Sequence, residues 1–507
     1  MRIAPARIAG WLAVGLSIAP LAKCRLADLR EVVKRTIARL PDTHVPGQIA
    51  VTDDGTDVGY ADWTPDLAKQ VVHDGHAGPV FEDVHRPWFR PHTRDVAYWG
   101  LDDEETGARV ALWIGDQAAA SVDFGGDFRF PTEPFLVFSR DGKRWAAAVE
   151  TVAHSVGEDE ARESYVVLVD GATAGHHAAV VGPAFSPDGR HVAWLAQDDD
   201  GASRLFVDGK VQRTYELPHV PCEEPMRRRG PLGTLPQYRI RYLADGSLLV
   251  LARDTTGWTV FRDDEPLAAY AVSRWEMTPP SEDRLRVGAQ IDVSSLRAAD
   301  AAPVVAWWER PAGVDDRWRV VRDGAPVDDV ACARSDYGPA LSEDGQHVAY
   351  ACEIGAPSHT QAWVVHDGQH YGPYAAVSGW AVSLSRDGSH VAYGASARGQ
   401  SATVFVDGVP RYRSRERDTV LREVRLDPEG RHAVWLAAVR VGSTDPIAQQ
   451  ELIVGIDGRA ITRADNVPWG PTFTSSGSVS WVVNRGRALS RIDARLARLH
   501  RRTTSRP

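Results

Sequence analysis

A short turn phrase recurs along most of this chain and constrains its fold more than any other feature. The clearest copy is Phe185-Ser186-Pro187-Asp188-Gly189, and an alternating stretch from Arg190 to Trp194 follows it. Proline presets φ for the first turn position, aspartate tolerates the second, and glycine accepts a positive φ. The phrase therefore predicts a tight hairpin that leads into a strand. Other copies begin at Phe138, Leu341, Leu384, Leu426 and Phe473, a copy from Leu243 to Gly246 keeps only the turn, and degenerate copies run from Phe89 to Tyr98 and from Leu296 to Trp307.

A second phrase alternates with the first, and it is an apolar run that ends in Asp-Gly. Asp-Gly between apolar runs is a strong hairpin signal. Each repeat of about 42 to 58 residues thus contains two hairpins, which make four short antiparallel strands. The clear copies end at Gly75, Gly171, Gly209, Gly324, Gly368, Gly408 and Gly458, and imperfect copies run from Leu112 to Asp116 and from Val260 to Asp264.

Four strands per repeat predict an all-β fold, a single β-propeller of four-stranded antiparallel blades. One sheet cannot bury both of its faces, so each blade must stack on its neighbours, and a ring closes the stack. The copies predict eight or nine blades, with seven as a further alternative. Because the Asp-Gly phrase comes first along the chain, N-terminal strands are expected to complete the last blade, which starts near Phe473. The alternative fold is two smaller all-β domains that divide within residues 270–305.

The phrase from Phe185 to Trp194 resembles the WD-like propeller repeat of TolB-type proteins, and the resemblance covers roughly residues 68–492. It implies a β-propeller and leaves the function open. The family repeat occurs in periplasmic scaffold proteins, in the propeller of prolyl-oligopeptidase-type peptidases and in many other bacterial proteins. The chain shows no α/β domain ahead of the propeller, so the resemblance is to the repeat and not to TolB as a whole.

The net charge of −10 is unevenly distributed. Residues 1–40 carry a net charge of +6 and residues 485–507 a net charge of +7, which leaves −23 for residues 41–484. An acidic body argues against nucleic-acid binding by the propeller. The composition, 43% hydrophobic and 25% charged, is that of a globular protein.

The two ends are expected to differ from the propeller of residues 68–492. Residues 1–23 form a leader-like segment, because Ile8 to Ala22 is uncharged and has the length of a signal-peptide core. Residues 24–46 are predicted to form an amphipathic basic helix and a linker, since apolar residues recur at helical spacing. Residues 493–507 are a basic tail. The helix prediction rests on Leu26, Leu29, Val33, Ile37 and Leu40.

These ends predict a periplasmic or membrane-anchored protein, with membrane contact through the N-terminal segment. A cytoplasmic protein is the alternative, because the positive charges that follow the leader oppose export. The sequence leaves open whether the leader is cleaved and whether Cys24 is lipidated. Cys332 and Cys352 can meet across neighbouring strands, although two buried thiols are the favoured interpretation.

No motif of a known catalytic or cofactor site occurs in the sequence: there is no G-x-S-x-G elbow, HExxH, phosphate-binding loop or EF-hand loop. The prediction is therefore no cofactor, no metal and no identifiable catalytic residue. His191, His347, His390 and His432 share one repeated position just after the turn. A repeated structural role, by packing or hydrogen bonding to the neighbouring blade, is favoured over a ring of metal ligands.

Tryptophans are numerous and fall into two groups. Those in strands are expected to fill the gaps between blades, and these are Trp99, Trp194, Trp307, Trp363, Trp435 and Trp481. Trp88, Trp380 and Trp469 precede the turn strands instead, where stacking on a carbohydrate or peptide is a minority interpretation. Residues 217–236 form the longest irregular insertion, and its separated charge blocks suit a partner contact.

The leading functional hypothesis is a monomeric, non-enzymatic scaffold that binds a protein or peptide partner, at the bacterial envelope. An enzyme, either a lyase or a glycan or peptide hydrolase, with its site at the central channel is the second hypothesis. Propellers can assemble such a site from residues scattered over several blades. The third is a membrane-attached scaffold that uses the basic ends.

Overall fold

The computed structural model describes residues 31–496, apart from 105–106, 124–134, 154–161, 199–201, 216–239, 255–256, 274–288, 313–316, 333–337, 355–360, 397–400, 417–418, 441–449 and 475–476. Every regular element in these residues is a β-strand, so the all-β prediction is confirmed. Within the described ranges, no helix has the length and apolar character needed to cross a membrane.

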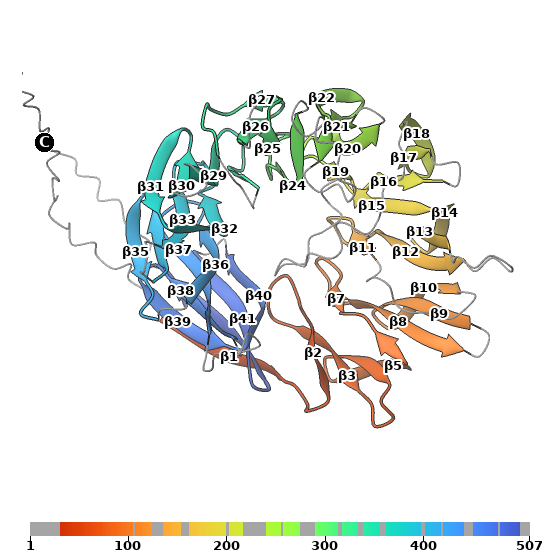
Figure 1. The fold of residues 1–507 in the computed structure, drawn as a ribbon. Coiled ribbons are helices and arrows are strands. Elements are labelled where there is room, and N and C mark those ends of the chain that lie inside the picture. The colour runs from red at the N-terminus through yellow and green to blue at the C-terminus, as the bar shows by residue number, and fades with distance from the viewer. Residues whose placement is uncertain are drawn as a thin grey trace, which may run out of the picture.

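The strands form ten separate sheets, which are the ten blades of a β-propeller arranged in a ring (Figure 1). Blade 1 consists of β2 (His44–Val51), β3 (Val58–Trp63), β4 (Lys69–His73) and β5 (His76–Phe81). Blade 2 consists of β6 (Asp83–Val84), β7 (Trp88–Phe89), β8 (Val96–Glu104), β9 (Gly107–Ile114) and β10 (Gln117–Asp123). Blade 3 consists of β11 (Phe135–Phe138), β12 (Trp145–Ala153), β13 (Arg162–Val169) and β14 (Ala172–His177). Blade 4 consists of β15 (Ala179–Phe185), β16 (Val192–Gln197), β17 (Ser203–Val207) and β18 (Lys210–Tyr215). Blade 5 consists of β19 (Ile240–Tyr242), β20 (Leu248–Asp254), β21 (Gly257–Arg262) and β22 (Glu265–Tyr270). Blade 6 consists of β23 (Val272–Ser273), β24 (Gln290–Ala298), β25 (Val305–Arg310), β26 (Arg319–Arg322) and β27 (Ala325–Pro326).

The remaining four blades continue the same pattern around the ring. Blades 7 and 8 consist of β28 (Ala340–Leu341), β29 (Val348–Ile354), β30 (Gln361–His366) and β31 (Gln369–Tyr374); and β32 (Ala376–Leu384), β33 (Val391–Ser396), β34 (Thr403–Val406) and β35 (Val409–Arg413). Blades 9 and 10 consist of β36 (Thr419–Leu426), β37 (Ala433–Arg440), β38 (Gln450–Ile456) and β39 (Arg459–Ala464); and β40 (Asn466–Phe473), β41 (Ser478–Arg485), β42 (Ala488–Arg495) and β1 (Glu31–Arg39).

The ring is closed by strands from the two ends of the propeller. β1 pairs with β42 in antiparallel register from Glu31 opposite Arg495 to Arg39 opposite Ala488. The expectation that an N-terminal strand completes the last blade is therefore correct. The expected strands, however, were those of the first Asp-Gly hairpin around Gly75, and these belong to blade 1.

The helix predicted within residues 24–46 is wrong where the structure describes it, because residues 31–39 form the strand β1. Its apolar residues recur at helical spacing partly because a bulge between Thr36 and Ala38 interrupts the strict alternation of the strand. The backbone pairing of β1 with β42 decides its conformation. An outermost strand of a blade buries few side chains, so its sequence shows no clear alternation of apolar and polar residues. Residues 1–23 and 497–507 lie outside the described residues, and so does Cys24.

The predicted number of blades, eight or nine, is also wrong, because the ring contains ten. The missed copy of the turn phrase is Thr52-Asp53-Asp54-Gly55 in blade 1. Thr52 takes the place of the usual serine: its hydroxyl donates to Asp54 at 2.8 Å and accepts from the backbone N–H of Asp57 at 3.0 Å. Because threonine offers the same hydroxyl as serine, this turn forms without the Ser-Pro-Asp-Gly signature.

The hydrophobic core lies in layers between neighbouring blades. Trp194 of blade 4, for example, packs with Ala146 and Val167 of blade 3 in one buried cluster. Five of the six strand tryptophans that we expected between blades are fully buried, and they are Trp99, Trp194, Trp307, Trp435 and Trp481. Burying a large apolar side chain contributes roughly 1.5–3 kcal/mol, so these layers hold the ring together.

Cys332 and Cys352 form a disulfide, which corrects the interpretation of two buried thiols. Cys332 follows blade 6 and pairs with Trp318 through two backbone hydrogen bonds of 2.7 and 2.8 Å. Cys352 lies on β29 of blade 7. The covalent bond therefore joins two adjacent blades.

Candidate functional site

The turn phrases of all blades lie on one side of the ring, which we call the turn face. In a four-stranded antiparallel meander, the first and third connections lie at the same end of the sheet. Where the phrases occur, the first connection of a blade carries the Ser-x-Asp-Gly phrase or a variant of it and the third carries the Asp-Gly phrase, as around Gly189 and Gly209 in blade 4. The turn face is thus where the repeated polar residues of the chain gather.

The Ser-x-Asp-Gly turn is held by its own side chains. In blade 4 the hydroxyl of Ser186 donates to Asp188 at 2.6 Å and accepts from the backbone N–H of His191 at 2.9 Å. Asp188 also accepts from the backbone N–H of Arg190 at 3.0 Å. The same three bonds recur in blades 3, 7 and 8, with Ser139 and Asp141, Ser342 and Asp344, and Ser385 and Asp387.

These bonds keep the exposed turn carboxylates ionised. The Ser139 hydroxyl lowers the pKa of Asp141 to about 2, and the Ser385 hydroxyl lowers that of Asp387 to about 2. A hydrogen bond to the charged form favours ionisation. The turn face consequently presents fixed negative charges well below neutral pH.

The aspartate of the Asp-Gly phrase accepts a hydrogen bond from the backbone that follows the Ser-x-Asp-Gly turn of the same blade. We call this arrangement the Asp clamp. In blade 4, Oδ1 of Asp208 accepts from the backbone N–H of Val192 at 3.0 Å, and Oδ2 lies 2.7 Å from Nδ1 of His191. Asp208 has a φ of 51°, a left-handed conformation that aspartate tolerates better than most residues. In blade 3 an arginine replaces the histidine, and Arg144 donates to Asp170 at 2.8 Å.

All four histidines of the repeated position take part in an Asp clamp. The Nδ1 to Oδ2 distances are 2.7 Å for His191 and Asp208, 2.6 Å for His347 and Asp367, 2.7 Å for His390 and Asp407, and 2.9 Å for His432 and Asp457. The histidine and the aspartate of each pair lie within one blade. The expected hydrogen bond from these histidines to the neighbouring blade is therefore not the one that forms with the aspartate. The predicted repeated structural role is nevertheless confirmed by these contacts.

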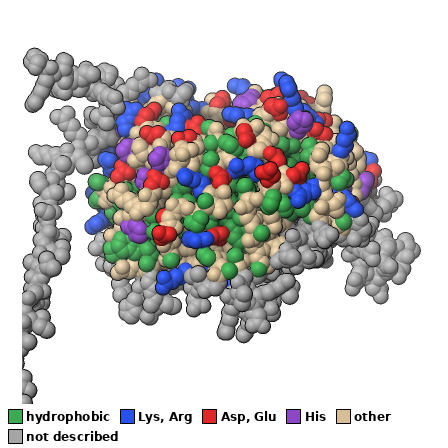
Figure 2. All heavy atoms as spheres, turned by 90° about the horizontal axis from the view of Figure 1, so that it is seen from above, with side chains coloured by type: hydrophobic (Ala, Val, Ile, Leu, Met, Phe, Trp, Pro, Cys, Tyr) green, Lys and Arg blue, Asp and Glu red, His purple; other side chains and the backbone are tan. Residues whose placement is uncertain are grey.

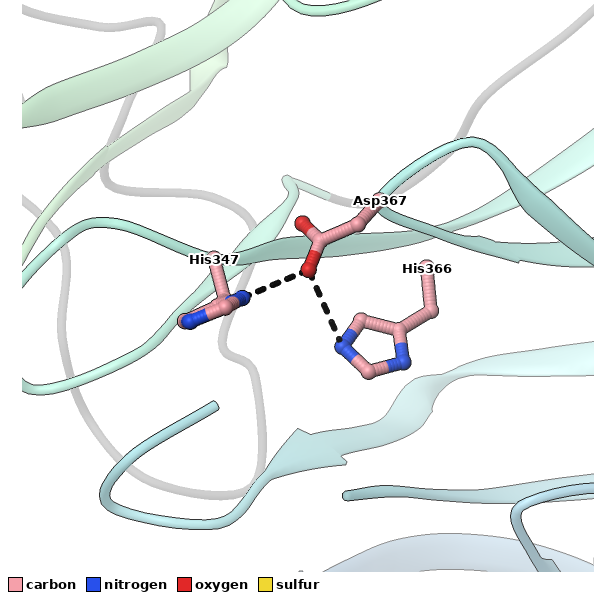
Figure 3. Close-up of side chains that lie close together, drawn as sticks. All are labelled: His347, His366 and Asp367. Atoms are coloured by element: carbon pink, nitrogen blue, oxygen red, sulfur yellow. Dashed lines mark hydrogen bonds and ion pairs between the residues drawn. The ribbon is translucent and has the colours of Figure 1, made fainter. Parts of the chain in front are cut away.

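Blade 7 adds a second histidine to its clamp (Figure 3). Nε2 of His366 lies 3.5 Å from the same Oδ2 atom of Asp367 that contacts His347. The two rings approach this carboxylate oxygen from different sides in Figure 3. Within the described residues, His347, His366 and Asp367 are the one group of histidines and carboxylates compact enough to hold a metal ion. Sequence reasoning did not find this group, because His366 resembles His73 before the Asp-Gly of blade 1, which repeat duplication explains, and no sequence pattern places His366 beside His347.

The group lies on the turn face, at the contact between blades 7 and 8. Nε2 of His366 donates to the carbonyl oxygen of Gly388 at 2.8 Å. Gly388 leaves no room for a side chain, because a Cβ there would lie 2.4 Å from Cβ of His347. The next pair of blades repeats this packing with Gly430 and His390.

The basic ends of the sequence meet in the last blade. Exposed cations lie along β1 and at the end of β41, and we call them the basic edge; they are Lys34, Arg35, Arg39 and Arg485. Part of the basic tail is therefore the strand β42, which ends at Arg495. One basic strand of this blade also closes the ring, since Arg491 donates to the backbone carbonyl of Asp54 in blade 1.

The three tryptophans considered for stacking all lie on strands, and these are β7, β32 and β40. Trp88 on β7 packs against the core between blades 2 and 3, and Trp469 on β40 packs near Ile49 and Val58 of blade 1. Trp380 lies on β32. For Trp88 and Trp469 the packing supports a structural role. The insertion 217–236 lies outside the described residues.

The comparisons with known proteins give no relative in sequence. No protein-family model matches the chain, and no curated protein matches it. Among solved structures, the chain is similar to the β-propeller domain of the Trilobed protease from Pyrococcus furiosus, which is described as having an open velcro topology. The identity is 13%, the match covers 65% of this chain and 97% of that one, and the TM-score is 0.26.

A second similar structure is dipeptidyl peptidase 4 from Porphyromonas gingivalis. The identity is 10%, the match covers 79% of this chain and 65% of that one, and the TM-score is 0.36. Scores this low carry no statement about activity. The propeller assignment rests on the strand pairing of this chain, and membership of the TolB-type repeat family stays a prediction.

Proposed function

We propose that this protein is a non-catalytic β-propeller scaffold whose turn face binds a basic protein or peptide segment, at the bacterial envelope. The observation that carries the proposal is the repeated, rigid array of ionised carboxylates on that face. Asp141 and Asp387, with pKa values of about 2, stand in the same turn of two different blades. Fixed charges of one sign steer a partner of the opposite sign and give its binding specificity.

Cations lie beside these carboxylates on the turn face: Lys143 is 3.3 Å from Asp141, and Arg190 is 3.7 Å from Asp188. Figure 2 shows acidic and basic side chains interspersed on the rim of the ring, together with hydrophobic ones. The outermost strands are also poor docking edges: the pairing of β5, β18 and β35 contains a bulge, and Pro79 and Pro410 lie in β5 and β35. Bulges and prolines on an edge strand prevent the addition of another strand. The turn face is therefore the more suitable surface for a partner.

The location at the envelope is supported by the disulfide between Cys332 and Cys352. Disulfides persist in oxidising compartments such as the bacterial periplasm and are rare in the cytosol. A periplasmic or membrane-anchored location is thus part of the proposal. N-terminal sequencing of the mature protein and thiol labelling in intact cells test it, and a reduced Cys332 in cells contradicts it.

Affinity capture with matched charge variants tests the partner. The full chain is used as bait on an envelope extract of the source organism, beside Asp264→Lys with Glu265→Lys, two exposed acids of the blade 5 turn. Asp123→Lys is the control, because Asp123 is equally exposed, at 73% against 75% for Asp264, and lies at the end of the outer strand β10. We expect a basic partner with the wild type and the control that the turn variant loses. Capture of no partner, or of the same partner by all three, refutes the proposal.

Attachment to an anionic membrane is the second candidate function, and the basic edge favours it. Lys34, Arg35 and Arg39 are exposed on β1, which follows directly after residues 1–30 with their apolar stretch. Each lysine or arginine near an anionic bilayer contributes about 1 kcal/mol of attraction.

Vesicle co-sedimentation separates this candidate from the first. The full chain is mixed with phosphatidylglycerol–phosphatidylcholine vesicles or with phosphatidylcholine alone, at low and high salt. We expect salt-sensitive binding to the anionic vesicles that Lys34→Glu with Arg35→Glu weakens. The control Arg190→Glu removes an exposed cation from the turn face and leaves binding unchanged. Equal binding of all variants, or binding to neutral vesicles only, contradicts a role of the basic edge.

A further inference from the structure

Blade 7 differs from three sister blades at one position beside its Asp clamp. The residue that precedes the clamp aspartate is Val207 in blade 4, Val406 in blade 8 and Ile456 in blade 9, whereas blade 7 has His366. All four blades have the His-Asp pair itself. The clamp therefore does not need a second histidine in order to fold, and His366 requires a different explanation.

The three side chains of blade 7 converge on one point. Oδ2 of Asp367 lies 2.6 Å from Nδ1 of His347 and 3.5 Å from Nε2 of His366, and the three atoms all lie within 4.8 Å of one another. The side chain of His366 is 10% exposed, while those of His347 and Asp367 are 39% and 40% exposed. One ligand is thus fixed by packing, and the other two remain accessible from solvent.

We propose that His347, His366 and Asp367 bind a zinc ion at the contact between blades 7 and 8. Two imidazole nitrogens and one carboxylate oxygen are ligands that zinc prefers, at distances of about 2.0–2.2 Å. In a tetrahedral site with such bonds, neighbouring ligand atoms are about 3.4 Å apart. The separation of 3.5 Å between Asp367 and His366 already matches this value.

The remaining adjustment is small. The hydrogen bond between His347 and Asp367 must lengthen by less than about 1 Å to reach the tetrahedral separation, while Oδ1 of Asp367 keeps its hydrogen bond to the backbone N–H of Val348. Zinc takes the place of the protons that the ring nitrogens now share with their acceptors, because a ligating nitrogen must be unprotonated. The carbonyl oxygen of Gly388, 2.8 Å from Nε2 of His366, or a water molecule supplies the fourth ligand.

The position of the site indicates what the ion does. Nε2 of His366 gives up its hydrogen bond to Gly388 when it binds zinc, so the ion joins blades 7 and 8 where the carbonyl oxygen of Gly388 becomes the fourth ligand. Blade 7 is already bonded to blade 6 through Cys352. With Gly388 as the fourth ligand, blade 7 is fixed to both of its neighbours. This role is independent of the partner proposed for the turn face.

Metal analysis of the full chain tests the site. Protein stripped with a chelator is dialysed against zinc chloride, the bound zinc is measured by plasma mass spectrometry, and its affinity is measured by competition with a zinc indicator. We expect one tightly bound zinc per chain and a higher melting temperature with zinc than without it. His366→Val, which restores the residue of blades 4 and 8, is expected to weaken zinc binding at least about tenfold. His370→Ala, an exposed histidine of the same hairpin, is the control and keeps the ion.

A gain-of-site variant makes the test independent of any loss of folding. Val207→His places a second histidine beside His191 and Asp208, as His366 does in blade 7. Val207 is only partly buried, so the blade has room for the change. We expect this variant to bind a second zinc ion. Zinc binding that His366→Val leaves unaltered, or a wild type that binds no zinc at micromolar concentrations, overturns the proposal, and binding that His370→Ala abolishes points to an adventitious ion.

Discussion

Cys332 and Cys352 join blade 6 to blade 7 through a disulfide, and both residues are buried among the aromatic side chains of that layer. The bond closes a loop with a sequence separation of 20. A cross-link of this length stabilises a protein by about 3 kcal/mol, chiefly because it restricts the unfolded chain.

Removal of this disulfide is expected to lower the free energy of unfolding by about 2–4 kcal/mol. The variant combines Cys332→Ala and Cys352→Ala, and urea unfolding followed by tryptophan fluorescence measures the loss. Reductant should lower the unfolding midpoint of the wild type and leave that of the variant unchanged. A wild type that is insensitive to reductant would contradict the expectation.

The turn carboxylates predict how stability depends on pH. Because the Ser385 hydroxyl holds the pKa of Asp387 at about 2, against 3.8 for the ordinary group, this residue stabilises the folded state above pH 4. That contribution is lost as the pH falls from about 4 to about 2. In Ser385→Ala the pKa of Asp387 should rise, and stability should fall less steeply in this window. Carboxyl-carbon NMR titration measures the pKa, and an Asp387 that titrates near 3.8 in the wild type would be the contrary result.

Two turn glycines of blades 7 and 8 separate backbone strain from packing. Gly368 and Gly388 have φ values of 78° and 69°, so alanine strains both by about 1–2 kcal/mol. A Cβ at Gly368 meets nothing within 4 Å, whereas one at Gly388 lies 2.4 Å from Cβ of His347. Gly388→Ala should therefore cost about 1–3 kcal/mol more than Gly368→Ala. Equal urea midpoints for the two variants would show that the blades can move apart at no cost.

Ring closure by β1 predicts a sharp boundary for N-terminal truncation. Deletion of residues 1–30 leaves β1 and its pairing with β42 intact, so the melting temperature should change little. Deletion of residues 1–39 exposes the edge of β42 and the buried side chain of Leu489, and we expect a lower melting temperature and association of the chains. Calorimetry and light scattering measure both effects, and identical behaviour of the two truncated chains would exclude β1 as a closing strand.

The repeats allowed the fold to be predicted from the sequence, because each turn phrase dictates a backbone conformation by itself. Ser186 and Asp188 form the same three hydrogen bonds as Ser385 and Asp387, so one clear copy identifies the others. The repeat copy at Thr52 was not recognised, because the expected phrase has serine at this position. The turn needs only a hydroxyl there, and threonine also supplies one. The blade count failed for this reason.

Tertiary contacts decided the features that sequence could not show. The residues of β1 are an edge strand because β42 lies beside them, and this pairing joins the first and last strands of the ring. The approach of Cys332 to Cys352, and that of His366 to His347, depend on which blades and turns are neighbours.

The pairing of β1 with β42 has a consequence for synthesis in the cell. Blades 1 to 9 are built from strands that follow one another along the chain, so each can fold as it leaves the ribosome or a translocation channel. β1 is made first and must wait for its partner until the last strand has emerged. A chain that stops short of Ala488 keeps an unpaired strand at each end, and such edges are recognisable to chaperones and proteases. The ring therefore closes only after the whole propeller has been synthesised.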